Sequence, residues 1–466
     1  MSYQATIKNT AFEKLGRDIA RQHPKWRIAG VVVKISPTSI TVSDRIGAFP
    51  IGTRIDIEME DGVLAGEVCR VDDETVDVLP FGSVAGVQRG AKVVASKAGH
   101  VLYPADSWRG RIVDGLGRPM DGKGPLASGP RAMPLKASAP SAAMRARLGK
   151  PIDFGVKAMT TFTPAKEGQR IGLFSGSGIG KSSLISMIAK NTACDVAVIA
   201  LIGERGREVR EFIEDTLGPE GLARSIVVVA TSDEPALVRR EAAFTAAAIA
   251  EYFRDEGAHV LYLMDSISRI AAAQREIGLA SGEPPTTRGY TPSVFSLLPA
   301  LLERAGPGLE TAQGNAGAIT GVYSVLVEGD DHEEPIADAA RATLDGHIVL
   351  SRRIAETGRF PAIDILKSVS RSDPGNSVDD RILLQEMREL ISIYDDMSEM
   401  IRIGAYVTGA NAKVDKAIEM HPKIERFLTQ SIAECVREGE AFGELRSLLP
   451  QCEGSERVAE HVNEEY

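Results

Sequence analysis

The sequence predicts a multidomain α/β protein with an N-terminal β-barrel, a central α/β domain with a mostly parallel sheet, and a C-terminal helical domain. Three observations support this fold class. Short strand patterns separated by Gly, Pro and Asp turns fill residues 25–97, a spacing typical of a small barrel. Apolar strands and amphipathic helices then alternate until about residue 370, as a doubly wound sheet requires. Residues 373–466 have long charged stretches and few β-branched runs, which favours helices.

The overall composition indicates a globular protein of several domains. At 466 residues, the length predicts about three domains. The net charge of −10 disfavours a nucleic-acid partner, because nucleic-acid binding usually requires a basic excess. Four widely separated cysteines suit a reducing compartment better than a disulfide framework. The first 25 residues carry charges and lack the apolar core of a signal peptide, and no apolar run reaches the roughly 18–20 residues of a membrane span. We therefore expect a cytoplasmic protein without a direct transmembrane segment, which reaches a membrane only through partners.

The segment before the barrel, residues 1–24, is expected to be an amphipathic docking helix. Phe12, Leu15 and Ile19 recur at helical spacing among charged residues. So short a helix is marginal alone and gains stability from a partner surface. A disordered tail is the alternative interpretation.

The barrel and the connector that follows it have distinct patterns. Five strands are expected in the barrel, at residues 28–33, 39–42, 54–59, 64–71 and 74–78. Residues 98–165 are rich in turn sequences, so they predict a connector whose backbone wraps the α/β domain. Counted with this connector, the α/β domain is expected to span residues 98–372.

A glycine-rich loop near the start of the α/β pattern predicts nucleotide binding. It follows an apolar strand at residues 171–174 and precedes apolar residues at helical spacing, the context that a phosphate loop requires. The candidate ligand residues are Gly176, Ser177, Gly178, Ile179, Gly180, Lys181, Ser182 and Ser183. The glycines let backbone N–H groups turn toward phosphate oxygens. Lys181 adds charge for the β- and γ-phosphates, and the Ser182 hydroxyl can ligate Mg²⁺. Ser175 replaces the first glycine of the strict motif, and a loop that merely turns the chain is the alternative.

A second chemical element is the carboxylate of Asp265. Residues 260–265 form an apolar strand pattern that ends in this residue. Downstream of a phosphate loop in one α/β domain, such a strand delivers a carboxylate toward Mg²⁺ and its waters. An isolated strand that happens to end in Asp has the same appearance.

A third element lies between these two. The apolar strand pattern of residues 196–202 runs into Gly203, Glu204 and Arg205. In doubly wound sheets, ligands gather beyond the carboxyl ends of the strands, so Glu204 is placed to reach a γ-phosphate and polarise an attacking water. The alternative is that Glu204 and Arg205 form a surface ion pair.

These motifs carry a resemblance to a known family. The chain resembles the catalytic subunits of rotary ATPases at residues 203–209, 230–235, 338–341, 361–364 and 368–371. Within that superfamily it is similar to flagellar type III export ATPases at residues 217–225, 282–287, 329–332 and 344–352. The resemblance is densest from about residue 98 to 372. Injectisome ATPases of virulence secretion share nearly all of these motifs and are the alternative.

The resemblance implies a RecA-like central domain that hydrolyses ATP with Mg²⁺. Lys181 and Ser182 match the residues that hold the phosphates and the metal, and Asp265 matches the metal-side aspartate of this family. Glu204 matches the glutamate that activates water, which non-catalytic ring subunits lack. Arg205 matches the neighbour that supports the phosphate side.

The resemblance also implies a site shared between subunits. Arg371 matches the arginine finger that reaches into the next subunit, and Arg269 matches an arginine that lines the site. An identical finger on every chain permits a homohexamer. Phe360 matches the aromatic residue that stacks on adenine, and the second adenine wall is expected from the region of Tyr406.

Several partners follow from the same resemblance. Residues 391–400 match the helix–loop–helix that grips the central stalk, so a coiled-coil, FliJ-like stalk protein is expected at an acidic loop near Tyr394–Met400. A solvated helix turn is the alternative there. Residues 1–24 match the segment that binds a FliH-like regulator. The other implied partners are the export gate, chaperones and export substrates, at the cytoplasmic face of the inner membrane.

Three further classes compete with this interpretation. The catalytic subunit of an ATP synthase would need a distinct non-catalytic partner to complete its ring. A Rho-like RNA translocase is disfavoured by the acidic balance and by sparse aromatic residues in residues 25–97. A non-enzymatic nucleotide sensor is disfavoured by the presence of both Glu204 and Arg371.

Overall fold

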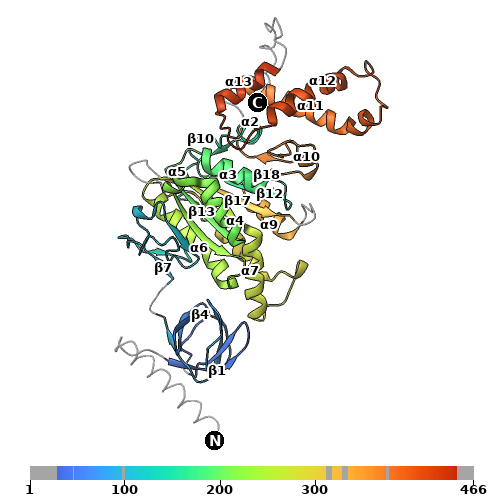
Figure 1. Ribbon diagram of the computed structural model, residues 1–466. Coiled ribbons are helices and arrows are strands. Elements are labelled where there is room, and N and C mark those ends of the chain that lie inside the picture. Colours follow the sequence, from blue (N-terminus) through green and yellow to red (C-terminus); the bar gives the residue numbers. More distant parts are fainter. Residues whose placement is uncertain are drawn as a thin grey trace. The chain divides into compact units, whose positions relative to one another are not determined.

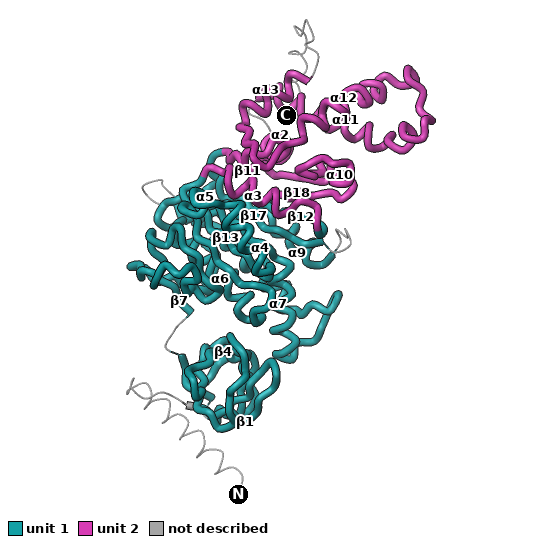
Figure 2. The backbone as a smooth tube through the Cα atoms, viewed as in Figure 1, with its two compact units in different colours: residues 1–150, 166–177, 194–345 teal, residues 151–165, 178–193, 346–466 magenta. Residues whose placement is uncertain are grey.

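The computed structural model describes residues 29–45, 47–96, 100–310, 317–327, 334–373 and 377–448. These residues belong to two compact units (Figure 2). Unit 1 comprises residues 1–150, 166–177 and 194–345, and unit 2 comprises residues 151–165, 178–193 and 346–466. The expected docking helix at residues 1–24 lies outside the described residues. Among the described helices, none has the length and apolar composition that crossing a bilayer demands.

Unit 1 begins with a closed β-barrel (Figure 1). Its strands are β1 (Ala29–Ile35), β2 (Ile40–Ser43), β3 (Arg54–Met59), β4 (Gly62–Val71), β5 (Thr75–Pro80) and β6 (Lys92–Ala95). They pair in the order β1-β2-β5-β4-β3-β6, and β6 closes the barrel by pairing with both β1 and β3. The predicted barrel is therefore confirmed. The strand patterns do not predict β6, because a run of 4 residues is too short to be distinctive.

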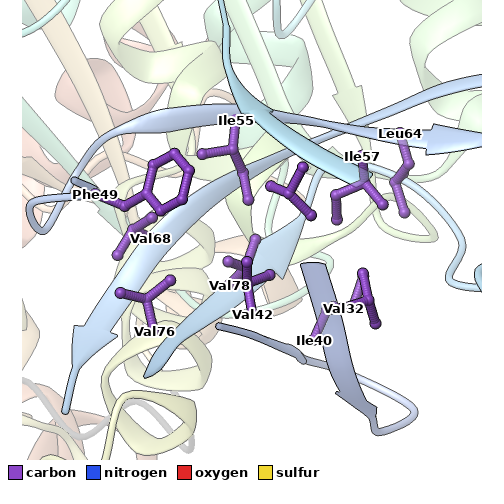
Figure 3. Close-up of a cluster of buried hydrophobic side chains, with 11 residues drawn as sticks. Val32, Ile40, Val42, Phe49, Ile55, Ile57, Leu64, Val68, Val76 and Val78 are labelled. Carbon is purple, nitrogen blue, oxygen red and sulfur yellow. The ribbon is translucent and has the colours of Figure 1, made fainter. Parts of the chain in front are cut away.

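Alternating side chains fill the interior of the barrel (Figure 3). In β3, Ile55 and Ile57 are fully buried, whereas Arg54 and Asp56, which alternate with them, are partly exposed. This period of two is what one buried face of a strand requires. The interior cluster consists of Val32, Ile40, Val42, Phe49, Ile55, Ile57, Leu64, Val68, Val76, Val78 and Val93.

The rest of unit 1 is built on a parallel sheet. Its strands are β8 (Ile112–Asp114), β12 (Arg170–Ser175), β13 (Val196–Glu204), β14 (Ser225–Thr231), β15 (His259–Asp265) and β17 (Ala318–Leu326). Within this unit they run parallel in the order β12-β17-β15-β13-β14-β8. The short β16 (Gly306–Pro307) pairs antiparallel with β17, so the sheet is mostly parallel, as predicted. The connector contributes β8 as a strand beside β14, and therefore does more than wrap the domain.

Helices flank this sheet along the chain. In unit 1 they are α4 (Gly206–Glu211), η2 (Phe212–Leu217), α5 (Gly218–Ala223), α6 (Ala236–Asp255), α7 (Ile267–Ala280), α8 (Pro292–Leu302) and α9 (Pro335–Thr343), with the short turns η1 (Asp106–Trp108) and η3 (Thr287–Gly289). The small connector strands of unit 1 are β7 (Val101–Leu102) and β9 (Met133–Pro134), whereas β10 (Pro151–Ile152) belongs to unit 2 and β11 (Ala165–Lys166) begins there. Helix α6 contains an apolar run that we predicted to be too short to span a membrane. In the structure this run is buried against the sheet.

Unit 2 contains the helical end of the chain. Its elements are α2 (Lys157–Phe162), α3 (Lys181–Asn191), β18 (Gly346–Val349), α10 (Arg352–Glu356), β19 (Val369–Ser370), α11 (Val378–Arg402), α12 (Ala412–Leu428) and α13 (Glu438–Leu448). Figure 1 shows α11 and α12 packed as a pair, and the predicted helical domain is confirmed. The Ser377 and Asn411 side chains cap the two helices by accepting hydrogen bonds from backbone N–H groups.

The acidic loop expected near Tyr394–Met400 is not a loop. These residues lie inside α11, and the connection to α12 runs from residue 403 to 411. Asp395 and Asp396 are exposed, and acidic residues are compatible with an exposed helical face. Glycine disfavours helix, and the first glycine after these residues is Gly404. The helix therefore continues through the acidic segment.

Candidate nucleotide-binding site

Asp265 lies at the carboxyl edge of the sheet in unit 1. It ends β15 and is only 8% exposed. The Ser324 hydroxyl on the neighbouring strand β17 donates a hydrogen bond of 2.5 Å to its carboxylate. A carboxylate in this position has a fixed direction, because a buried strand carries it and a hydroxyl holds it.

Glu204 lies at the same edge, on the adjacent strand β13. Leu201 pairs with Asp265 in the parallel register, so Glu204 stands three residues further along its strand. Adjacent strands are about 4.8 Å apart, which brings the two acidic positions to neighbouring strand ends. The sheet thus gathers two carboxylates where doubly wound folds bind ligands.

The residue before Glu204 must be glycine. Gly203 has a φ of +73°, and a Cβ atom there would lie 2.9 Å from the side chain of Arg269. The first turn of α7 can therefore pack directly on the backbone that carries Glu204. The structure places Arg269 beside this strand end, and gives the exposed Arg205 an ion pair of 3.9 Å with Glu208.

The phosphate-loop sequence begins in unit 1. Ser175 is completely buried at the end of β12, and its carbonyl oxygen accepts a hydrogen bond of 2.9 Å from Val327. A serine side chain is small enough to be buried here while the backbone keeps its strand hydrogen bond. This accounts for the departure from glycine. Gly176 and Ser177 follow, with Gly176 buried and Ser177 exposed.

Unit 2 contains the rest of that sequence. Gly178 and Gly180 have φ values of +77° and +92°, in the left-handed region that favours glycine. Between them, the Ile179 side chain is 1% exposed and anchors the loop. Helix α3 begins at Lys181, with Lys181 and Ser183 partly buried and Ser182 exposed. The unpaired N–H groups of a helix N-terminus are a favourable environment for an anion.

Phe360 presents an aromatic face beside this loop. The residue is 45% exposed, and a Cβ atom built on Gly180 would lie 3.4 Å from its ring. The Phe360 carbonyl accepts a hydrogen bond of 2.9 Å from the Gln430 backbone, just after α12. A ring held at its backbone and open on one side can stack on a planar base.

Tyr406 does not lie beside Phe360. Its hydroxyl donates to the Asn411 carbonyl and to Asp415, each at 3.0 Å, at the start of α12, whereas Phe360 is bonded at the end of that helix. Helix α12 has 17 residues, so about 25 Å of helix separates the two ends. The expectation that the region of Tyr406 forms the second adenine wall is therefore wrong, because α12 carries this region away from the loop.

Arg371 is exposed at the end of a short strand pair in unit 2. It follows β19, which pairs antiparallel with β18. The Ser370 hydroxyl anchors this strand by donating a hydrogen bond of 2.5 Å to the Pro164 carbonyl. The guanidinium is thus carried on an ordered strand end.

Each unit supplies one oxygen donor of a kind that hard divalent cations bind. Ser182 supplies an exposed hydroxyl at the start of α3, and Asp265 supplies a carboxylate whose position is fixed by Ser324. Oxygen donors of these two kinds are those that Mg²⁺ prefers beside nucleotide phosphates. Ser324 and Gln430 were not found by sequence reasoning, since their roles depend on strand pairing and on where α12 ends.

Family comparisons cover most of the chain. Residues 155–370 match the nucleotide-binding domain of the ATP synthase alpha/beta family, and residues 32–97 match the beta-barrel domain of that family. Residues 377–447 match the T3SS EscN ATPase C-terminal domain.

Individual relatives agree with these matches. The flagellum-specific ATP synthase of Caulobacter vibrioides is 51% identical over 425 residues, which cover 91% of this chain and 96% of the relative. The assembled ATPase EscN from the enteropathogenic E. coli type III secretion system is similar with a TM-score of 0.82 and 39% identity, over 90% of this chain and 99% of EscN. EscN in complex with its central stalk EscO gives a TM-score of 0.80 and 40% identity over the same shares.

Proposed function

The chain belongs to the flagellum-specific ATP synthase family, within the ATP synthase alpha/beta family, and we propose that it hydrolyses ATP with Mg²⁺ to power flagellar protein export. Membership of the family makes it an ATPase. The observation that carries the proposal is the pair of carboxylates, Asp265 and Glu204, at neighbouring parallel strand ends in a chain with a phosphate loop. The greater identity to the flagellar relative than to EscN, 51% against 39%, favours flagellar export over virulence secretion.

Each site residue has a separate task in this proposal. Lys181 neutralises the β- and γ-phosphates, while the glycine-rich backbone donates N–H groups to their oxygens. Ser182 and Asp265 hold Mg²⁺, which supplies charge neutralisation at the phosphates when bound. Glu204 orients and polarises the attacking water. Phe360 stacks on the adenine, with its backbone held by Gln430.

A matched pair of variants tests these tasks. Lys181→Ala is expected to lose nucleotide binding, because the point charge for the phosphates is gone. Glu204→Gln is expected to keep nucleotide affinity and to reduce kcat by about 10²–10⁴-fold, the usual contribution of a positioned base. The measurements are fluorescent-nucleotide titration and phosphate release. Normal phosphate release by Glu204→Gln contradicts the water-activating task.

We also propose that the working form is a homohexamer with Arg371 as a finger in the neighbouring site. Arg371→Ala is then expected to lower kcat by about 10³-fold or more without weakening nucleotide binding by one chain. Lys367→Ala, at an exposed position on the same segment, is the control. ATPase rate is measured against protein concentration, with mass determined in the same buffer. An equal specific rate in a stable monomer contradicts both the ring and the finger.

The proposed partners follow from the relatives. EscN forms a complex with its central stalk EscO. By analogy, a coiled-coil stalk protein would contact this chain at α11, near Tyr394–Met400. The FliH-like regulator, export gate, chaperones and substrates, and a position at the cytoplasmic face of the inner membrane, belong to the same proposal. Capture of a stalk protein by the chain, lost when α11 is altered, tests the first of these contacts.

A further inference from the structure

Strand β17 carries a serine whose hydroxyl is committed to Asp265. Met264 pairs with Tyr323 in the parallel register, so the next residues of the two strands, Asp265 and Ser324, lie side by side. Ser324 is 1% exposed, and its hydroxyl donates a hydrogen bond of 2.5 Å to Oδ1 of Asp265. Hydrogen bonds from a hydroxyl to a carboxylate are charge-assisted and stronger than neutral ones. One of the two carboxylate oxygens of Asp265 is therefore engaged within the protein.

A second serine fastens the strand that carries this donor. Helix α7 begins at Ile267, two residues after Asp265, and its second residue is Ser268. The Ser268 hydroxyl accepts a hydrogen bond of 2.9 Å from the Leu326 N–H and donates one of 3.2 Å to the Leu326 carbonyl. Leu326 is the last residue of β17, two residues beyond Ser324. The helix that follows the acceptor thus holds the strand that carries the donor, which keeps Ser324 and Asp265 together.

The engaged oxygen matters because Mg²⁺ and Ca²⁺ make different demands on a carboxylate. Mg²⁺ requires a near-octahedral shell, keeps several waters and is bound through few carboxylate oxygens. Ca²⁺ takes more oxygen ligands at longer distances, and it often binds both oxygens of one carboxylate. At Asp265, the bond from Ser324 competes with any contact between Oδ1 and a cation. The carboxylate is therefore suited to act through a single oxygen, which meets the demands of Mg²⁺ and disfavours bidentate contact with Ca²⁺.

We propose that Ser324 is a positioning residue that makes Asp265 select Mg²⁺ over Ca²⁺, by keeping Oδ1 engaged and the carboxylate in one orientation. The proposal rests on the proposed function, since it assumes that Asp265 serves the nucleotide-bound cation, directly or through a water. Ser324 acts through Asp265 and touches neither cation nor nucleotide. Without its hydroxyl, the carboxylate can rotate, so that it fits Mg²⁺ less well and offers both oxygens to a larger cation.

Nucleotide binding by the full-length chain, rather than turnover, tests this selectivity. The dissociation constant of a fluorescent, non-hydrolysable ATP analogue is measured with a chelator, with saturating Mg²⁺ and with saturating Ca²⁺. Dividing the chelator value by each metal value gives the enhancement of affinity due to that cation. In the unaltered chain, we expect Mg²⁺ to give the larger enhancement. In Ser324→Ala, we expect the ratio of the Mg²⁺ to the Ca²⁺ enhancement to fall about fivefold or more, since partners that orient metal ligands usually change metal affinity by 10–100-fold.

Three variants make the result specific. Ser324→Thr keeps the hydroxyl on a residue that suits a strand, so it should retain the selectivity. Ser225→Ala removes a buried hydroxyl from β14 of the same sheet, where it donates 2.6 Å to the Gly221 carbonyl, and should leave the ratio unchanged. Ser324→Cys has a similar shape and only a weak S–H donor, so it should lose part of the selectivity even if Ser324→Ala folds poorly. The affinity measured with the chelator reports folding and should stay within about threefold in every variant.

The outcomes separate this inference from the proposed function. An unchanged ratio in Ser324→Ala overturns the inference. Equal weakening with both cations also overturns it, because Ser324 would then support the strand without selecting a metal. Equal enhancement by Mg²⁺ and Ca²⁺ in the unaltered chain, or analogue binding that responds to neither, contradicts selection at Asp265. Failure of the unaltered chain to bind the analogue under any of these conditions overturns the proposed function as well.

Discussion

Each unit contains an ionic junction, that is, a set of ion pairs joining two elements that are far apart in the sequence. The two junctions differ in the number of charges they contain and in how deeply the carboxylates are buried. In unit 1, the barrel meets α6 through the pairs Arg54–Glu241 and Glu67–Arg240, each at 2.8 Å, and Arg240 also pairs with Glu241 of its own helix at 2.9 Å. All four side chains are at most 14% exposed. In unit 2, a single pair joins Arg359 to Glu425 on α12, and the Glu425 side chain is 33% exposed.

The difference lies in the number of carboxylates around the buried guanidinium, which is two for Arg240 and one for Arg359. Burial alone would lower the pKa of Arg240, yet Glu67 and Glu241 raise it above its usual value. Burial alone would raise the pKa of Glu67, yet Arg240 and Lys136 hold it below its usual value. In unit 2, by contrast, burial dominates and the pKa of Arg359 is lowered. In each junction the Nε of an arginine lacks a hydrogen-bond partner among the described residues, so what distinguishes the network in unit 1 is its second carboxylate.

The largest expected effect comes from breaking the network in unit 1. Arg240→Met removes the cation that bridges Glu67 and Glu241, leaving two buried carboxylates with fewer partners. Loss of one partner from a buried ion pair costs about 3–5 kcal/mol of unfolding free energy. Urea denaturation should show this loss.

The control for that experiment is an exposed pair of the same barrel. Lys92→Met disrupts a pair of 3.6 Å with Glu58, in which both side chains are 56% exposed. The expected change is within about 0.5 kcal/mol. If Arg240→Met is no more destabilising than Lys92→Met, the buried network does not hold the barrel to α6.

A smaller loss is expected from the junction in unit 2. Arg359→Met removes a guanidinium that is incompletely hydrogen-bonded, and the Glu425 carboxylate left behind can be hydrated. We expect a loss of about 1–2 kcal/mol, below that of Arg240→Met, because the desolvation of the cation is also relieved. The same urea measurement checks it. An equal or larger loss than in Arg240→Met would mean that the two junctions do not differ in the way their geometry indicates.

The two junctions also mark the limit of sequence reasoning. Neither was predicted, because each joins residues far apart in the chain, and no local pattern indicates which charges meet. The positions of Asp265 and Glu204 were easier to predict, because long apolar runs identify strands and the carboxyl ends of parallel strands share one edge of the sheet. Tyr406 was misplaced for the opposite reason: its position depends on the length and direction of α12, which periodicity alone does not supply.

The smallest expected effect is on the pH dependence of the unfolding free energy, to which one histidine beside each junction contributes. The His100 Nε2–H in unit 1 donates a hydrogen bond of 2.9 Å to the Gly52 carbonyl, and burial, followed by the charge of Arg54, lowers the pKa of His100. Burial also lowers the pKa of His421 in unit 2, where Glu425 opposes the shift and Arg359 adds to it. Since both folded pKa values lie below the unfolded value of about 6.5, the unfolded chain binds more protons below that pH. Both histidines therefore lower the unfolding free energy as pH falls through about 6.5.

The two histidines should contribute unequally to that slope. At His100, Arg54 and Lys136 lower the pKa and outweigh the opposing effect of Glu67, whereas at His421 the carboxylate of Glu425 raises the pKa more than Arg359 lowers it. Each slope is expected to be below about 1 kcal/mol per pH unit, because both rings are partly hydrated. Urea midpoints at pH 7.5, about 6.5 and about 5.5 should show that His100→Gln flattens the dependence more than His421→Gln does. If His421→Gln flattens the dependence more, protonation of His421 is more unfavourable than protonation of His100. Glu425 would then not be an effective counterion for the charged His421 ring.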